Sequence, residues 1–350
     1  MRKLLVPSLL FLYSLAISLY GQNTKYKPAA RLSFNEDGRF KVLQLTDTHY
    51  ISGDKRSTRA LRSIEEMLES EKPDFVIHTG DIIFGAPAEQ GVKELFAPLV
   101  QRGIPFAVTL GNHDGQFDLN RKEIFQAICR IPGCVNRPAE EKGISGDSND
   151  YLTLSSKNGI EFVFYLLDSG DLFAMPEEAK PRKCYDFIRF DQIEWYRTLS
   201  LRFKKKNNGS PVPSVAFFHI PLPEISSFCV KPSAVITGNN EEPPCPSKIN
   251  GGLYAQMREL QDVFAVVNGH DHDCDYVLDY GPIAFIYGRY SGGDTVYNHL
   301  GAEGRSDEKI SGARVLEFTS GQSGFDTWVR LQGGIIQQRL HIAPKIQSQP

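Results

Sequence analysis

The sequence predicts an α/β fold in which two β-sheets pack together and helices cover their outer faces. Between residues 41 and 129 a short apolar strand, a polar turn and an amphipathic helix recur in that order, and such alternation builds a sheet with helices on its faces. From residue 283 onward the apolar segments are short and strand-like, which indicates a second sheet packed on the first. Polar residues follow the predicted strands directly, and the carboxyl edge of an open sheet is where α/β proteins build their sites.

The first part of the chain predicts three strand–helix units. Strands are expected at residues 41–46, 75–78 and 106–110, and helices at residues 57–70, 89–102 and 119–129. The first helix has its apolar residues Leu61, Ile64, Met67 and Leu68 at the spacing of one helical face.

The middle of the chain predicts a β-hairpin at residues 151–154 and 160–167, because the turn-forming pair Asn158-Gly159 lies between these segments. A helix is expected at residues 191–203, and strands at residues 215–219, 263–268, 283–287, 314–318, 327–331 and 335–342. Residues 222–250 are rich in Pro, Ser and Asn, which predicts a surface insertion.

One domain accounts for most of the chain. Its 350 residues, 41% hydrophobic and 23% charged, have an ordinary globular composition. We assign the domain to residues 38–345, after a polar lead-in at residues 22–37. The formal net charge is −3, so the chain lacks the positive field that is typical of a dedicated nucleic-acid binder. No nucleic-acid partner is therefore expected.

The N-terminal residues predict export. Met1-Arg2-Lys3 is basic, the run from Leu4 to Leu19 is almost unbroken in its apolar character, and small and polar residues follow. This pattern is typical of a cleaved signal peptide, which we assign to residues 1–21. The run is shorter than the roughly 20 apolar residues of a membrane span, and a retained N-terminal anchor is the alternative. We expect a secreted or periplasmic protein with no stable membrane span.

Six cysteines follow the predicted signal peptide. An even number of cysteines in an exported chain suggests disulfides. Two pairings have a local rationale: Cys129 with Cys134 around a turn, and Cys229 with Cys245 across the insertion.

Five short polar blocks each lie at the C-terminal end of a predicted strand. In chain order they are Asp47-Thr48-His49, Gly80-Asp81, Gly111-Asn112-His113-Asp114, His219 and Gly269-His270-Asp271-His272. Five strands thus deliver polar groups to one rim of the sheet. Residues i and i+2 of an extended chain point the same way, so two of the blocks can each present two donor atoms to one small region.

These blocks supply the ligands for a pair of metal ions. The candidates are Asp47, His49, Asp81, Asn112, His219, His270 and His272. Nitrogen and oxygen donors without a thiolate favour two divalent or mixed-valence transition metal ions, namely manganese, iron or zinc, over calcium or magnesium. Two ions about 3.5–4 Å apart clamp a phosphoryl group and lower the pKa of a bound water. A metal-bound hydroxide is then expected to attack phosphorus.

His113 is a candidate catalytic residue. Because it adjoins Asn112, we expect its side chain to point toward substrate and to act as general acid for the leaving oxygen. Asp114 is expected to orient it. Arg289 follows the strand at residues 283–287 and is a candidate for binding phosphate oxygens, although a plain surface turn explains it equally well.

The order Asp-x-His, Gly-Asp, Gly-Asn-His-Asp, His and Gly-His-x-His resembles the calcineurin-like metallophosphoesterase superfamily, and it spans Asp47 to His272. The resemblance implies a four-layer αββα sandwich, in which two packed mixed sheets are flanked by helices. It implies one metal ion held by Asp47, His49, Asp81 and His272. It implies a second ion held by Asp81, Asn112, His219 and His270, with Asp81 as the bridge. Within the superfamily the chain is similar to the secreted branch related to purple acid phosphatases.

Two positions depart from the purple acid phosphatase pattern. Those enzymes place a metal-binding Tyr three residues after the bridging Asp and have Asp-x-Gly in the first block. Here Phe84 and His49 occupy these positions, so no tyrosinate-to-iron colour is expected. The resemblance does not distinguish a phosphate monoester from a diester.

The sequence therefore predicts a secreted, dinuclear metal-dependent phosphoesterase that acts on a small-molecule phosphate ester. The alternative is a non-catalytic protein of the same fold, which serves as a metal-binding scaffold or a binding protein. The intact set of candidate ligands favours the enzyme. Neither the oligomeric state nor the identity of the metals is indicated.

Overall fold

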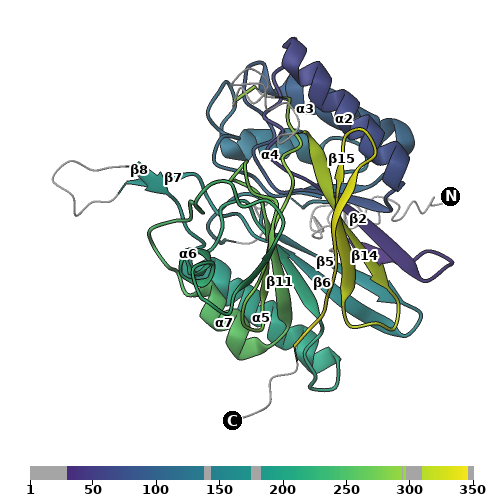
Figure 1. Ribbon diagram of the computed structural model, residues 1–350, viewed down its shortest axis with the longest axis vertical. Coiled ribbons are helices and arrows are strands. Elements are labelled where there is room, and N and C mark those ends of the chain that lie inside the picture. Colours follow the sequence, from purple (N-terminus) through teal and green to yellow (C-terminus); the bar gives the residue numbers. More distant parts are fainter. Residues whose placement is uncertain (1–29, 138–142, 175–182, 294, 297–309, 346–350) are drawn as a thin grey trace, which may run out of the picture.

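Two large sheets are present and pack face to face, as the sequence predicts (Figure 1). The C-terminal strands at residues 312–342 were expected in the second sheet, but they extend the first sheet by pairing with the strand at residues 39–45. The computed structural model describes residues 30–137, 143–174, 183–293, 295–296 and 310–345. The predicted signal peptide at residues 1–21 lies outside these ranges. Among the described residues, no helix has the length and apolar composition needed to cross a bilayer.

The first sheet has six strands in the order β16-β15-β14-β2-β3-β4. Its strands are β2 (Arg39–Leu45), β3 (Phe75–His78), β4 (Phe106–Val108), β14 (Gly312–Thr319), β15 (Phe325–Leu331) and β16 (Ile336–Ile342). The neighbours β2, β3 and β4 are parallel, whereas the C-terminal strands join them antiparallel. The sheet is therefore mixed, and the carboxyl ends of β2, β3 and β4 meet at one edge.

The second sheet has eight strands in the order β1-β5-β6-β9-β11-β13-β12-β10. Its strands are β1 (Arg31–Ser33), β5 (Asp150–Ser156), β6 (Gly159–Leu166), β9 (Ser214–Phe217), β10 (Val235–Thr237), β11 (Val263–Asn268), β12 (Val277–Asp279) and β13 (Ala284–Tyr287). Strands β6, β9, β11 and β13 are parallel neighbours. A separate pair is formed by β7 (Leu172–Ala174) and β8 (Lys183–Tyr185).

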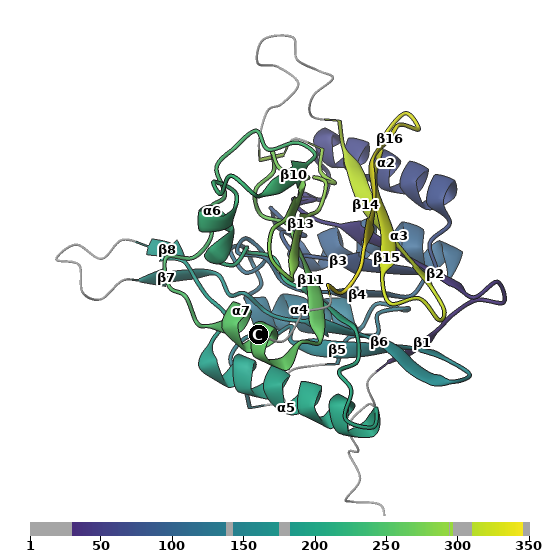
Figure 2. The ribbon, with the colours of Figure 1, turned by 60° about the horizontal axis from the view of Figure 1, so that its bottom comes forward.

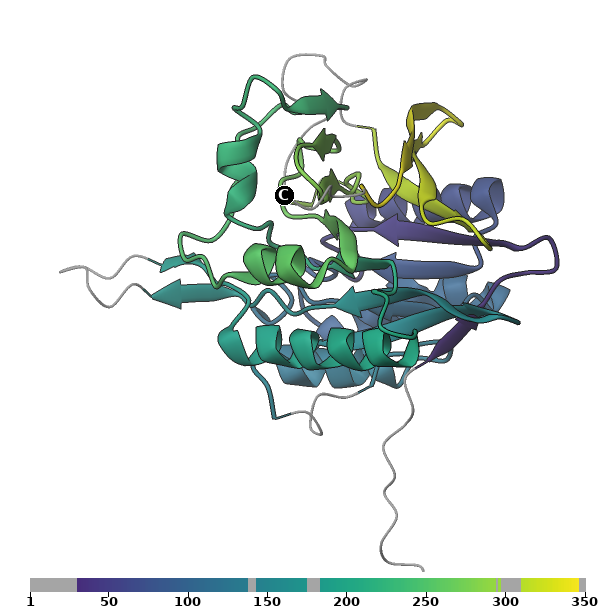
Figure 3. The ribbon, with the colours of Figure 1, turned by 90° about the horizontal axis from the view of Figure 1, so that it is seen from below.

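Helices cover the outer faces of both sheets (Figures 2 and 3). The helices are α2 (Lys55–Glu71), α3 (Ala88–Arg102), α4 (Arg121–Cys129), α5 (Phe190–Lys206), α6 (Glu224–Phe228) and α7 (Leu253–Leu260). Asp54 caps α2 by accepting the backbone N–H of Arg56. The helix buries Ile64, Met67 and Leu68 against the six-stranded sheet.

Side chains that point alternately to the two faces of each strand form the apolar core between these layers. In β6 the side chains of Phe162 and Phe164 lie between the two sheets, and those of Val163 and Tyr165 lie under α5 and α7. Successive strand residues point to opposite faces, so a strand that is apolar at every position is buried on both sides. Three apolar layers result, one between the sheets and one under each helical layer. The predicted αββα sandwich is confirmed.

Several short elements were not predicted from the sequence. The lead-in at residues 22–37 contributes β1, which pairs in parallel with β5. The insertion at residues 222–250 contains α6 and β10, and β10 forms one edge of the eight-stranded sheet. These segments are therefore partly integrated into the sandwich.

The six cysteines are thiols in the structure, and neither expected disulfide is present. Sγ of Cys134 lies 3.6 Å from Oδ1 of Asn136, and Sγ of Cys229 lies 2.9 Å from the carbonyl oxygen of Ile225. Spacing along the chain does not fix the separation or the direction of two Cβ atoms, on which a disulfide depends.

A buried ion pair joins the two halves of the sandwich beside the predicted ligands. Asp168, just after β6, accepts from the guanidinium of Arg121 at 2.6 Å and from the backbone N–H groups of Asp147, Ser148 and Gly170. Arg121 also donates to the carbonyl oxygen of Gly111. Burial acts to raise the pKa of Asp168, but Arg121 and the N–H donors outweigh it and hold that pKa below its usual value.

We predict that Asp168→Asn lowers the free energy of unfolding at pH 7 by about 3–5 kcal/mol, because Arg121 keeps its buried charge without a counter-charge. A carboxyl group with a lowered pKa stabilises the fold above its unfolded pKa and loses this effect as the pH falls through its folded pKa. The difference in the free energy of unfolding between wild type and Asp168→Asn, measured by denaturant unfolding, should therefore be smaller at pH 3 than at pH 7.

The matched control is Asp326→Asn, which removes an exposed ion pair with His341 and should cost less than about 1 kcal/mol. If Asp168→Asn loses the same amount of unfolding free energy at pH 3 as at pH 7, the Asp168 charge has no stabilising role.

Candidate metal centre

All seven predicted ligands lie in loops that follow strands of the two sheets. β2 leads to Asp47 and His49, β3 to Asp81, β4 to Asn112, β9 to His219, and β11 to His270 and His272. All seven side chains are buried. The parallel directions of these strands bring the loops to the same edge of the sandwich.

Glycines in the predicted blocks allow these loops to approach one another closely. A Cβ on Gly111 would lie 2.2 Å from Oδ1 of Asp81, and a Cβ on Gly269 would lie 1.9 Å from Oγ1 of Thr46. Real Cβ atoms do not make such contacts, so any larger residue would push the loops apart. The glycines that precede Asn112 and His270 are thus required by packing.

Backbone strain is concentrated at the centre. Eight described non-glycine residues have a positive φ, and four of them are predicted ligands. Their φ values are 53° at Asp47, 46° at His49, 52° at Asp81 and 84° at His270. Such conformations persist only where surrounding contacts impose them, and they are common at functional sites.

One oxygen of Asp81 lies between histidines from the two sheets. Oδ2 of Asp81 is 3.6 Å from Nε2 of His49 and 3.1 Å from Nε2 of His219. Its other oxygen, Oδ1, accepts the backbone N–H of His113 at 2.8 Å. The Asp81 carboxylate is thereby held in place through Oδ1, and Oδ2 faces the imidazole nitrogens.

The remaining donors converge on this carboxylate. Nε2 of His272 lies 3.0 Å from Nε2 of His49 and 3.4 Å from Oδ1 of Asp47. Nδ1 of His270 lies 3.3 Å from Nε2 of His219. Ligand atoms of Asp47, His49, Asp81 and His272 all lie within 4.8 Å of one another, which is close enough for one small cation to contact them all.

The electrostatics of the centre favour a cation. Burial lowers the pKa of His49 and of His270 to about 3, so both rings are neutral. Burial also acts to lower the pKa of His219, but the charges of Asp81 and Asp47 outweigh it and raise that pKa to about 9. Burial acts to raise the pKa of Asp81, yet His219 holds that pKa well below the usual value. Two ionised carboxylates therefore draw positive charge to this point.

Two further observations fit metal ligands. The carbonyl oxygen of Thr79 lies 2.8 Å from Nδ1 of His219; because a carbonyl only accepts, Nδ1 carries a proton, and Nε2, which faces Asp81, is the nitrogen that would bind a metal ion. Among the described residues, the buried Oδ1 of Asn112 accepts no hydrogen bond. An unpartnered buried amide oxygen is costly unless something else satisfies it, and a metal ion would do so.

The side chain of His113 lies at the more exposed side of this cluster. Its ring packs edge-on against His49 at 5.4 Å and against Phe84 at 5.0 Å. Nδ1 of His113 pairs with Oε1 of Gln116 at 2.8 Å, and the amide nitrogen of Gln116 donates to the carbonyl oxygen of Asn112. Gln116 therefore presents an acceptor to His113, and Nδ1 must carry a proton.

The structure gives Asp114 a different partner from the one we expected. Its carboxylate is buried and accepts the backbone N–H groups of Ile82, Ile83 and Gly111. It thus joins the loops after β3 and β4, while Gln116 makes the contact with His113 that we had expected of Asp114. The backbone curves after His113, so adjacency in sequence did not place the two side chains together.

Arg289 is also engaged within the protein. Its guanidinium donates to the carboxylate of Asp275 at 2.8 Å and to the carbonyl oxygen of Ile310 at 2.9 and 2.7 Å. The side chain is 5% exposed. These contacts explain Arg289 as a structural residue and give no support to the expected contact with phosphate.

Sequence reasoning missed three side chains that contact the predicted ligands or His113. Gln116 holds His113, as described above. Tyr185 of β8 packs at 90° on His270, with ring centroids 4.2 Å apart, and Tyr290 packs on His272 at 5.2 Å. No motif marks these residues, since each reaches the centre through tertiary packing.

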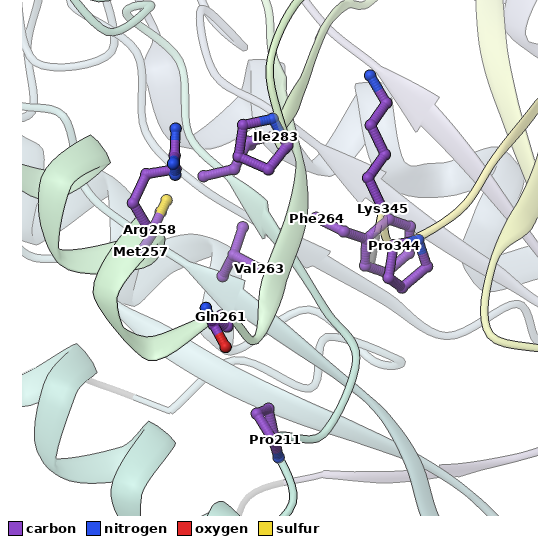
Figure 4. A pocket seen from close by; sticks show the side chains of 10 residues that line it. Pro211, Met257, Arg258, Gln261, Val263, Phe264, Ile283, Pro344 and Lys345 are labelled. Carbon is purple, nitrogen blue, oxygen red and sulfur yellow. The ribbon is translucent and has the colours of Figure 1, made fainter. Parts of the chain in front are cut away.

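A cavity of about 250 Å³ lies elsewhere (Figure 4). It is lined by the beginnings of β11 and β13, by α7 and by the C-terminal Pro344 and Lys345. None of its lining residues is a predicted ligand. The ligands follow the carboxyl ends of the strands, so the cavity and the centre lie at opposite edges of the sheet.

Comparison with known proteins agrees with this geometry. A family model described as calcineurin-like phosphoesterase matches residues 40–274. The chain belongs to this family. The matched region contains all five polar blocks, so the predicted family is confirmed.

The relatives differ in what their names say about activity. The chain is 31% identical over 290 residues to "Probable inactive purple acid phosphatase 29" of Arabidopsis thaliana, which covers 74% of this chain and 73% of that protein. It is 28% identical over 337 residues to "Phosphatase DCR2" of Saccharomyces cerevisiae, covering 87% of this chain and 56% of that protein. The chain is thus related to proteins named after purple acid phosphatases, and these similarities do not show that it catalyses a reaction.

A solved structure of a dimetal phosphatase from Danio rerio has the same fold. It matches with a TM-score of 0.56 at 14% identity, over 87% of this chain and 99% of that chain. The match confirms the fold of the calcineurin-like phosphoesterase and carries no information about substrate.

We predict that Asp81→Asn reduces bound metal from about two ions per chain to fewer than one, because this carboxylate lies between His49 and His219 and would contribute to both metal positions. Elemental analysis after dialysis against manganese or zinc measures this change. The control is Asp37→Asn, an exposed acid in the turn before β2, which should leave the metal content unchanged. Retention of both ions by Asp81→Asn would contradict its central position.

Proposed function

We propose that the protein is a dinuclear metal-dependent phosphoesterase. In this proposal one ion is held by Asp47, His49, Asp81 and His272, and the other by Asp81, Asn112, His219 and His270. The observation that carries it is the position of Oδ2 of Asp81, which lies between Nε2 of His49 and Nε2 of His219. A carboxylate oxygen that faces one imidazole of each set is suited to bridge two cations.

The bound ions would supply the charge that stabilises a phosphoryl group and activates water. The chain's own residues orient the reaction. The backbone N–H of His113 fixes the Asp81 carboxylate. The loop after β4 thereby fixes the positions of both the proposed bridging carboxylate and the His113 ring. Asp114 supports this loop through Gly111, Ile82 and Ile83, so its role is to position His113 and Asp81.

His113 is the proposed general acid. Because Gln116 accepts the proton on Nδ1, the other ring nitrogen, Nε2, is available to deliver a second proton to a leaving oxygen. The ring is only partly buried, so a substrate can reach it. General acid catalysis by a positioned side chain typically contributes about 10²–10⁴-fold to the rate.

The substrate is proposed to be a small phosphate ester, either a monoester or a diester. The net charge of −3 does not favour a long polyanion. The competing function is a non-catalytic metal-binding scaffold of the same fold. The word "inactive" in the name of the Arabidopsis relative supports that alternative, whereas the complete set of donors supports the enzyme.

Turnover of p-nitrophenyl phosphate and bis(p-nitrophenyl) phosphate by protein loaded with manganese, zinc or iron tests this proposal. We expect hydrolysis of at least one ester, and loss of hydrolysis after chelation because the ions supply the charge on which the reaction depends. Bound metal without turnover of any ester would favour the scaffold, and absence of both would rule out the phosphoesterase.

We predict that His113→Gln lowers kcat by about 10²–10⁴-fold and leaves the metal content intact, since the proposed acid is lost while the ligands remain. Steady-state kinetics and elemental analysis of the same preparation measure both effects. His341→Gln, an exposed histidine on β16, is the matched control and should keep full activity. Full activity of His113→Gln would show that another group protonates the leaving oxygen.

We also propose that the protein is exported, on the composition of residues 1–21. The mature chain should then begin near residue 22. N-terminal sequencing of protein recovered from the periplasm or the medium tests this proposal, and recovery of the intact N-terminus in a membrane fraction would indicate a retained anchor.

A further inference from the structure

The hairpin of β7 and β8 brings a tyrosine to the metal centre. This strand pair lies at the edge of the molecule in Figures 1 and 2. Tyr185 is the last residue of β8 and pairs with Leu172 of β7. Its carbonyl oxygen accepts the hydroxyl of Ser247 at 2.9 Å, so the insertion at residues 222–250 anchors the backbone of Tyr185 from another side.

The ring of Tyr185 lies on the half of the centre that contains His219 and His270. It meets His270 at right angles, with ring centroids 4.2 Å apart. The Nδ1 atom of that histidine faces His219. Burial raises the pKa of Tyr185 to about 12, and the charges of Cys245, Asp271 and Asp81 act in the same direction. Tyr185 is thus near His270 and within the field of the proposed bridging residue.

The hydroxyl of Tyr185 is available for a ligand. Within the part of the chain that the structure describes, it makes no hydrogen bond. The buried hydroxyl of Tyr287, by contrast, donates to Asp271 at 2.6 Å. Tyr185 is only partly buried, and a phenol is protonated at neutral pH. It therefore presents a spare O–H donor beside a cluster of acceptor groups.

We propose that the Tyr185 hydroxyl donates a hydrogen bond to a phosphoryl oxygen of the ester bound at the centre. This inference rests on the proposed phosphoesterase function and adds a substrate-contacting residue to it. His113 packs against His49, and Tyr185 packs against His270, so the ester would be contacted from both sets of ligands. One side chain would protonate the leaving oxygen, and the other would bind an oxygen that stays on phosphorus.

The deletion of a single oxygen atom tests the proposal. Tyr185→Phe keeps the ring on His270, so the metal content should not change. We expect kcat/KM to fall by about 10-fold to 100-fold, the range for a hydrogen bond to a charged group. The affinity for inorganic phosphate, measured by calorimetry on the metal-loaded protein, should fall as well.

The matched control is Tyr254→Phe. Tyr254 is also partly buried and also packs edge-on against an aromatic ring, that of Phe228. It belongs to α7, and its hydroxyl lies beside Gly281, which precedes β13 and is therefore at the opposite edge of the sheet from the centre. Phosphate affinity and kcat/KM should remain at wild-type values in this variant.

The outcomes separate this inference from the proposed function. If wild type hydrolyses an ester and Tyr185→Phe is unchanged in both kcat/KM and phosphate affinity, the inference is wrong and the phosphoesterase stands. If wild type binds phosphate without turnover and Tyr185→Phe binds it more weakly, the contact stands and the catalytic function fails. If wild type shows neither turnover nor phosphate binding, both are wrong. Loss of metal from Tyr185→Phe would also overturn the inference, because the hydroxyl would then support the ligands.

Discussion

Two buried carboxylates, Asp47 and Asp81, set the conditions that the surrounding structure has to meet. An ionised carboxylate in a protein interior is costly unless donors or cations compensate it. Here compensation comes from the opposite sheet: Asp47 accepts the backbone N–H of His270 from the loop after β11, and Asp81 faces His219 from the loop after β9. The carboxylates belong to loops of the six-stranded sheet, whereas these partners belong to the eight-stranded sheet. Correct packing of the two sheets is therefore what keeps the carboxylates ionised, and the carboxylates in turn fix the edges of the sheets together.

The strained backbone follows from the same constraint. Left-handed conformations at Asp47, His49 and Asp81 cost of the order of 1–3 kcal/mol each, and contacts between the loops maintain them. The N–H of Asp47 donates to the carbonyl oxygen of Gly80 at 3.0 Å, and that of His49 to the carbonyl oxygen of Asp81 at 2.9 Å. The loops after β2 and β3 thus continue to pair beyond the ends of their strands. Gly80 and Gly111 pass close to one another there, which explains why glycine precedes a ligand in each of these blocks.

The sequence was sufficient to predict two sheets between helical layers and to predict that the candidate ligands lie together, because both depend on patterns that the chain carries locally. The apolar strands β3 and β11 were predicted with the bounds that the structure has, and each polar block directly follows a strand. The strands that were missed, β1, β7, β8, β10 and β12, have three residues each, so their pairing depends on the neighbouring strand and not on their own composition. The same limit applies to single side chains. Neighbouring Asp114 and His113 diverge because the backbone turns between them, and Arg289 is buried by Asp275, a partner that no spacing rule connects with it.

Phe84 shows how one substitution alters the charge of such a centre and preserves its packing. A tyrosinate at this position would add a third negative charge to those of Asp47 and Asp81 and would favour a trivalent ion. Phenylalanine has no oxygen to offer. Its ring packs edge-on against His49 at 5.3 Å and against His113 at 5.0 Å, so it orients one proposed ligand and the proposed acid. The proposed ligand set therefore combines two carboxylates with imidazole and amide donors and contains no phenolate, a mixture that suits transition metal ions.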